Sequence, residues 1–134
     1  MTDSDKQIIK SESAALAAPD KPDKKPGPKR YCMLINVKKD SIAMYKEYHA
    51  KVWPEVLATI RNCNIKNYSI YLHDDLLIGY FEYHGTDYDA DMKKMAADPK
   101  TQEWWKIMMP IQVPLEGHAE GEWWTLTEEV FHTE

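Results

Sequence analysis

The pattern of apolar and polar positions divides the chain beyond residue 30 into alternating strands and helices. Residues 31–37 are apolar and rich in strand-forming side chains, so they predict a first strand. After a cap at Asp40 or Ser41, apolar positions recur at helical spacing over residues 42–60. Pro54 lies inside this run and predicts a bend or a new helical segment, because proline removes a backbone hydrogen bond and clashes with the preceding turn.

The remaining elements complete a β-α-β-β-α-β order. We expect strands at residues 67–72, 76–83 and 125–131, helices at 88–97 and 99–108, and a tight turn at Asp74 and Asp75. This order predicts an α+β fold, the ferredoxin-like βαββαβ sandwich. Four strands with both helical layers on one face leave the other face uncovered, so we expect a homodimer that covers it.

The first thirty residues have a different composition. Residues 1–30 hold no aromatic residue and half of the eight prolines, and we predict a disordered N-terminal tail there. All fifteen Phe, Tyr and Trp residues fall in residues 31–134, which form the predicted domain. No apolar run approaches the length of a membrane span.

The charge balance excludes some classes of partner. The whole chain carries −5 and residues 1–30 carry +2, so the predicted domain carries −7. A domain this acidic is a poor match for nucleic acid, an anionic membrane or a phosphorylated substrate. Cys32 and Cys63 lack metal-type spacing and indicate a reducing compartment, so we expect a cytoplasmic protein. No His, Cys or carboxylate cluster has the spacing of metal ligands, and no Gly-rich phosphate loop follows a strand.

Two aromatic-rich motifs carry the candidate chemistry. Tyr45 and His49 are four residues apart, so their side chains meet on one helix face. A histidine near neutral pKa can exchange protons at physiological pH, although a buried histidine that only packs against Tyr45 has the same spacing.

Trp104 and Trp105 form the second motif. Adjacent helical residues point about 100° apart, so we expect one indole to pack in the core and the other to line a cavity. Indole faces suit the C–H patches of a sugar ring, and indole N–H groups can donate to hydroxyls. Tyr68 and Tyr71 are three apart in a predicted strand, so one faces the cavity and the other does not. The spacing leaves open the roles of Trp123, Trp124 and His132.

Four segments together resemble the L-rhamnose mutarotase family. These are HAKVWPEVLATIR, NYSIYL, MAADPKTQEWWK and EEVFH, spread in order over residues 31–134. The resemblance implies a dimeric α+β barrel that interconverts the α and β anomers of L-rhamnose without a metal or cofactor. It implies that His49 is the proton donor and that Tyr45, Tyr68, Trp104 and Trp105 contact the sugar. It also implies that Glu129-Val130-Phe131 take part in dimer contacts.

Two other functions stay open from the residues alone. A monooxygenase or haem-dependent enzyme of the dimeric α+β barrel type would use His49 as an axial ligand, and a non-catalytic module would bind sugar without turning it over. For the mutarotase we expect a neutral pyranose. L-rhamnose comes first, because Met108 and the tryptophans could contact its methyl group, L-mannose second and L-fucose third.

Overall fold

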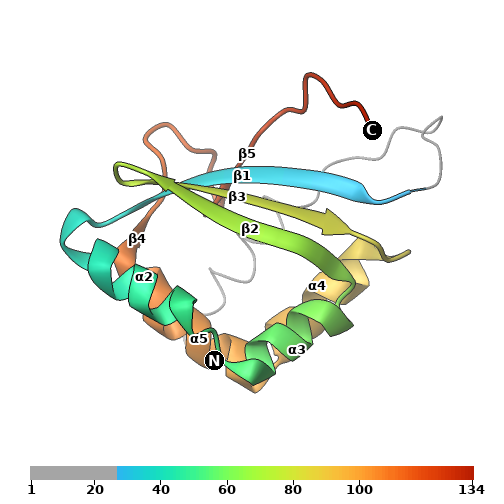
Figure 1. The fold of residues 1–134 in the computed structure, drawn as a ribbon, viewed down its shortest axis with the longest axis horizontal. Coiled ribbons are helices and arrows are strands. Elements are labelled where there is room, and N and C mark those ends of the chain that lie inside the picture. The colour runs from blue at the N-terminus through green and yellow to red at the C-terminus, as the bar shows by residue number, and fades with distance from the viewer. Residues whose placement is uncertain (1–26) are drawn as a thin grey trace.

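An antiparallel sheet curls over a layer of helices in the computed structural model, which describes residues 27–134 (Figure 1). The strands are β1 (Lys29–Val37), β2 (Ile65–His73), β3 (Leu76–Tyr83), β4 (Gln112–Val113) and β5 (Thr125–Leu126). The α-helices are α2 (Ile42–Ala50), α3 (Pro54–Asn62), α4 (Tyr88–Ala97) and α5 (Pro99–Met108), with short 3-10 turns at Lys39–Ser41 and Met109–Ile111.

The strand order confirms the predicted topology. The sheet runs β2-β3-β1-β4, with β5 also beside β1, and every pairing is antiparallel. The helices lie on one face of this sheet, so the fold is the expected ferredoxin-like α+β arrangement, here a half-barrel (Figure 1).

Pro54 starts a new helix, as its position in the apolar pattern predicted. It occupies the first turn of α3, where a missing N–H costs nothing, and α2 has already ended at Ala50. The helix α3 ends at Asn62, and Asn64 just beyond it takes a left-handed φ of 64°, a conformation that asparagine tolerates. The helical run is therefore two helices joined by a short link.

The second helical pair is capped by aspartates. The Asp87 side chain accepts a hydrogen bond from the Ala90 N–H at the start of α4. Asp98 does the same for Thr101 at the start of α5, with Pro99 in the first turn as predicted. These caps set the direction of α5, which carries the tryptophan pair.

The C-terminal strand differs from the prediction. Only Thr125 and Leu126 form strand, whereas residues 125–131 were expected. The edge of β1 is shared, because β4 pairs with Asn36 and Val37 while β5 pairs with Met33 and Leu34. The chain then leaves the sheet on the side away from the helices (Figure 1). Its apolar residues there find no strand partner within residues 27–134, so the pattern alone overstated the strand.

Alternation along β1 and β3 separates two sheet faces. One face packs on the helices and is formed by the buried members of each strand, which are Tyr31, Met33, Ile35, Val37, Leu77, Phe81 and Tyr83. The opposite face is only partly covered. Among the described residues no helix is long and apolar enough to cross a membrane.

The predicted tail lies largely outside the described part of the chain. Residues 27–134 begin just before β1, which starts at Lys29 and pairs Lys29 with Tyr83 and Arg30 with Glu82. The first strand therefore includes two residues that composition assigned to the tail.

Candidate active site

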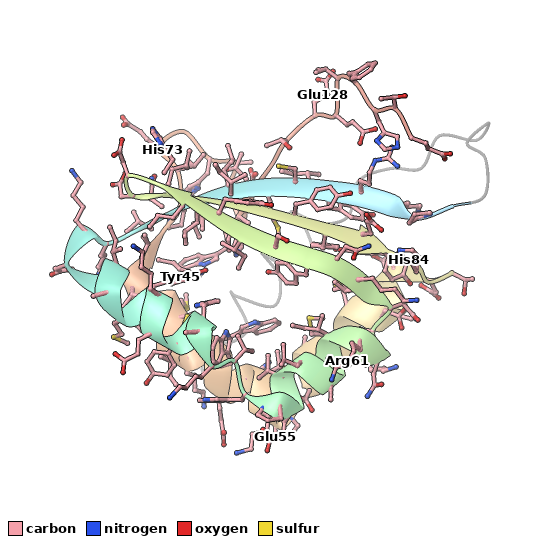
Figure 2. The ribbon with its side chains drawn as sticks, in the orientation of Figure 1. Tyr45, Glu55, Arg61, His73, His84 and Glu128 are labelled. Atoms are coloured by element: carbon pink, nitrogen blue, oxygen red, sulfur yellow. The ribbon has the colours of Figure 1, made fainter. Side chains whose placement is uncertain are left out.

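A cavity of about 360 Å³ lies between the sheet and the helices. All five residues singled out in the sequence line it, namely Tyr45, His49, Tyr68, Trp104 and Trp105. Figure 2 shows Tyr45 on α2, on the side where that helix faces the sheet. The volume is in the range of small-molecule sites, and most of the lining side chains are apolar.

His49 is held in one orientation by the backbone of its own helix. Its Nδ1 lies 2.8 Å from the carbonyl oxygen of Tyr45, one turn earlier. A carbonyl can only accept, so Nδ1 carries the proton and Nε2 is the nitrogen left for a ligand in the cavity. The Tyr45 ring stacks on the imidazole at 4.0 Å between centroids. Tyr45 thus orients His49 through its peptide carbonyl and its ring.

The surroundings of His49 favour its neutral form. Burial lowers the pKa of His49 from its ordinary value of 6.5, and the hydrogen bond to the Tyr45 carbonyl only partly offsets this. A neutral imidazole with Nδ1 protonated presents a lone pair at Nε2, so at neutral pH this side chain is ready to accept a proton.

The two adjacent tryptophans differ in burial, but both line the cavity. Trp104 is 7% exposed and meets His49 edge-on at 5.3 Å and Trp53 edge-on at 5.1 Å. Trp105 is half-buried and also lines the cavity. Trp104 therefore both packs beside the histidine and forms part of the wall, where only one of the two indoles was expected.

The two tyrosines of β2 point to opposite sides, as their spacing predicted. Tyr68 lines the cavity and lies 5.5 Å from the ring of Phe81. Tyr71 is 63% exposed and pairs with Ile78. The spacing predicted opposite faces without saying which ring faces the cavity, and in the structure that ring is Tyr68.

Two tryptophans and a glutamine of the cavity wall had no role assigned from the sequence. Gln112, Trp123 and Trp124 all line the cavity. The indole of Trp124 lies over Gly79, since a Cβ built on that glycine would be 3.4 Å from the Trp124 ring. Strand alternation could have pointed to Trp124. It lies just before the final strand and two residues before Leu126, so the two side chains are expected on the same face of the sheet. Gln112 carried no such signal, because its strand is only two residues long.

The other histidines lie away from this cavity. His73 is at the tip of the β2-β3 hairpin with its side chain 79% exposed, and His84 at the end of β3 pairs with Glu82 at 3.1 Å (Figure 2). His132 is exposed in the C-terminal segment. Among residues 27–134, no three His, Cys, Asp or Glu side chains form a cluster that could hold a metal ion.

The fold and the site together define a small α+β protein with an aromatic cavity and one oriented histidine. The family profile for L-rhamnose mutarotase matches residues 30–133. The chain belongs to the L-rhamnose mutarotase family, whose enzymes are isomerases.

Individual relatives carry two different sugar names. An L-fucose mutarotase from Xanthomonas campestris is 33% identical over 108 residues, covering 76% of this chain and 86% of the relative. An L-rhamnose mutarotase from Oceanobacillus iheyensis is 33% identical over 85 residues, covering 62% and 79%. The crystal structure of an L-rhamnose mutarotase from Formosa agariphila superposes with a TM-score of 0.62 at 22% identity, covering 79% and 99%. The last similarity supports the fold.

Proposed function

We propose that this protein interconverts the α and β anomers of a neutral 6-deoxyhexopyranose, with L-rhamnose as its first substrate. The observation that carries the proposal is His49, whose Nδ1 is fixed on the Tyr45 carbonyl at 2.8 Å while the ring lines an aromatic cavity. The family supports the same reaction.

The proposed mechanism needs only proton transfers. In ring opening, neutral His49 takes the proton of the anomeric hydroxyl through Nε2, and in ring closure it donates this proton back, which is the donor role that the resemblance implies. During opening a hydroxyl donor protonates the ring oxygen, and the bond from that oxygen to the anomeric carbon breaks. The open-chain aldehyde rotates, and the steps reverse on its other face. Tyr45 and Tyr68 line the cavity, and we propose their phenols as the donors, either directly or through water. No cofactor enters this scheme.

The cavity wall suits a 6-deoxy sugar. Met108 lies one turn beyond Trp104 and Trp105 on α5, and all three line the cavity. Such a wall can contact the sugar methyl group, and indole faces can cover its C–H patches. The same wall could contact the methyl group of L-fucose, and one relative is named L-fucose mutarotase, so L-fucose belongs in the test. Its rearranged hydroxyls should nevertheless make it the poorest of the three sugars.

One panel of anomer-exchange measurements tests the function. Saturation-transfer NMR follows exchange in L-rhamnose, L-mannose and L-fucose, with and without protein. We expect the fastest catalysed exchange with L-rhamnose, then L-mannose, then L-fucose. Fastest turnover of L-fucose would overturn the substrate assignment and leave the reaction standing. Sugar binding with exchange at the uncatalysed rate would instead indicate a non-catalytic module.

Substitution of the histidine tests the mechanism. His49→Ala should lower the catalysed exchange rate by about 10²–10⁴-fold, the usual contribution of a positioned acid or base. The matched control is His73→Ala, which changes an exposed histidine far from the cavity and should leave exchange unchanged. An unaltered rate in folded His49→Ala protein would remove His49 from the mechanism. A Soret band shift on adding haem to the wild type, lost in His49→Ala, would favour the haem alternative.

We also propose that the active form is a cytoplasmic homodimer. The sheet face away from the helices exposes Tyr71, and the C-terminal segment on that side exposes 88% of Val130 and 79% of Phe131. A second copy would bury these residues. Light scattering should give twice the mass of one chain, and deletion of residues 130–134 should shift it toward one. A monomeric wild type would contradict the proposal. The free thiols of Cys32 and Cys63 fit the reducing compartment.

A further inference from the structure

Gln112 and Trp123 form a hydrogen-bonded pair in the cavity wall. The indole Nε1–H of Trp123 donates to the side-chain oxygen of Gln112 at 3.0 Å, and both residues line the cavity. Gln112 begins β4, and Trp123 comes just before β5 at the other end of the loop between these strands. The pair thus links the two short strands that share the edge of β1.

This bond decides which way the amide of Gln112 points. An indole N–H is a donor only, so its partner must be the amide oxygen and not the nitrogen. The two N–H donors of the amide therefore lie at the opposite end of the group. Among residues 27–134, no acceptor is hydrogen-bonded to that nitrogen. A half-buried amide in a mostly apolar wall gains most from an acceptor brought by a ligand.

The backbone on both sides of the pair is held in place. Gln112 pairs with Val37, and the Lys38 N–H donates to the Ile111 carbonyl at 2.8 Å. On the other side, the two carboxylate oxygens of Glu122 accept the backbone N–H groups of Ala119 and Leu126 at 3.0 and 3.1 Å. The amide is therefore positioned before a sugar arrives, and little ordering is needed on binding.

We propose that Gln112 determines sugar specificity by donating from its amide N–H₂ to one ring hydroxyl of the pyranose, and that Trp123 is the positioning residue that keeps the amide in this orientation. The inference deepens the proposed mutarotase function and rests on it. The L-rhamnose and L-fucose rings differ in the configuration of hydroxyls, so one directed donor can separate them where the aromatic and methionine wall cannot.

The test pairs variants with sugars that lack one hydroxyl. For the sugar that the wild type uses best, kcat/KM for anomer exchange is measured with the parent and with each singly deoxygenated analogue. The loss of one hydrogen bond to the substrate is expected to cost about tenfold. One analogue should therefore be about tenfold poorer than the parent with the wild type. Gln112→Leu should lose about tenfold on the parent sugar and show no further loss with that analogue.

Substitution of Trp123 adds a readout that a purely structural role would not change. Trp123→Phe removes the N–H donor and should weaken discrimination of the same analogue through KM more than through kcat. In the Gln112→Leu background it should have no further effect on discrimination, because the amide that it positions is gone. The matched control is Trp124→Phe, which trims the neighbouring indole and leaves the Trp123–Gln112 bond in place. In that background Gln112→Leu should still cost about tenfold.

Each outcome separates this inference from the proposed function. A wild type that exchanges anomers, with a Gln112→Leu variant that keeps the same kcat/KM across the panel, would overturn the inference alone. Independent, additive losses from Gln112→Leu and Trp123→Phe would overturn the positioning role. A wild type inert toward every sugar would overturn the proposed function, and the inference with it. If Gln112→Leu does not fold, Gln112→Met in the same panel decides between these outcomes.

Discussion

The space between the sheet and the helices has an open end and a closed end, and both are built from aromatic side chains. The open end lies around His49 of α2, and the closed end lies around Tyr83, beside α4. Tyr45 and His84, the neighbour of Tyr83, mark these opposite ends in Figure 2. One end holds the cavity, whereas the other is filled by protein.

At the closed end, the side chains of Tyr83, Asn64 and Asp91 hydrogen-bond to one another. The Tyr83 hydroxyl donates to the Asp91 carboxylate at 2.5 Å and accepts from the Asp87 N–H at 3.1 Å. Asn64 donates to the same Asp91 carboxylate at 3.0 Å. The Tyr88 ring fills the remaining volume, 5.0 Å from Tyr83. Burial and the bond to Asp91 raise the pKa of Tyr83.

At the open end, one hydrogen bond fixes the orientation of each polar side chain and leaves its other polar atom available to a ligand. The Tyr45 carbonyl accepts a hydrogen bond from Nδ1 of His49, and the Trp123 indole N–H donates to the amide oxygen of Gln112. In each case a second atom of the same side chain is left for the cavity. Changes at the closed end should therefore alter stability, while changes at the open end should alter catalysis.

The largest effect on stability should come from Asp91→Ala at the closed end. It removes the acceptor of both Tyr83 and Asn64 and leaves a buried phenol without its carboxylate, so the free energy of unfolding should fall by about 2–3 kcal/mol. Urea denaturation measures this, and anomer exchange by the folded fraction should not change. Asp89→Ala, an exposed carboxylate in the same helical turn, is the control. Equal losses in the two variants would mean that the network at the closed end contributes no special stability.

The pH dependence of exchange should report on the open end. Because burial lowers the pKa of His49 below 6.5, kcat/KM should be flat at neutral pH. It should fall about tenfold per pH unit once the pH drops below that lowered pKa, because the proton acceptor is lost. The uncatalysed rate is subtracted at each pH. An inflection above 6.5 would argue against neutral His49 as the base.

The same shift predicts how stability changes with pH. The unfolded chain binds the His49 proton at about pH 6.5, whereas the folded chain binds it only at lower pH. The unfolded state therefore binds more protons in that window, so this contribution to stability falls as the pH drops below 6.5 and levels off below the folded pKa. His49→Gln should remove this part of the pH dependence, and His73→Gln should keep it.

A smaller effect should separate the two tyrosines of β2. Tyr68→Phe removes a hydroxyl in the cavity and should lower kcat/KM by roughly 3- to 10-fold. Tyr71→Phe removes the same atom on the opposite sheet face and should leave kcat/KM unchanged. Stability should change little in either. Equal kinetics for the two variants would exclude the Tyr68 hydroxyl from sugar binding and from the proton relay.

The sequence predicted much of the fold, and the pairing of Tyr45 with His49 at the open end, because these features carry local signals. The bounds of β3, α4 and α5 agree with the prediction, since Asp98 and Pro99 mark a helix start and alternation marks the strand. Tyr45 and His49 are neighbours by helical spacing alone. These features depend on residues close in the chain.

What the sequence did not predict depends on tertiary contacts. The Gln112–Trp123 bond joins two residues eleven apart across an irregular loop, and the Asp91 network joins α4 to the end of α3. The strand expected through Phe131 ends at Leu126, and the residues that follow leave β1, with Val130 and Phe131 exposed. The periodicity of apolar residues shows which face of a strand or helix a side chain lies on. It does not show whether another strand or side chain lies within bonding distance of that face.

The smallest effect is expected outside both ends, from deletion of residues 1–26. The composition of this segment gives it little apolar surface to bury against the domain. A chain that starts at Gly27 keeps all of β1, including the Arg30 guanidinium that pairs with Glu129 at 2.9 Å. Its thermal unfolding midpoint and anomer-exchange rate should match those of the full chain. A start at Tyr31 is the informative comparison, because it removes two paired residues of β1 and the Arg30–Glu129 ion pair, and it should lower the midpoint measurably. A large loss already at Gly27 would show that residues 1–26 contribute to the folded domain.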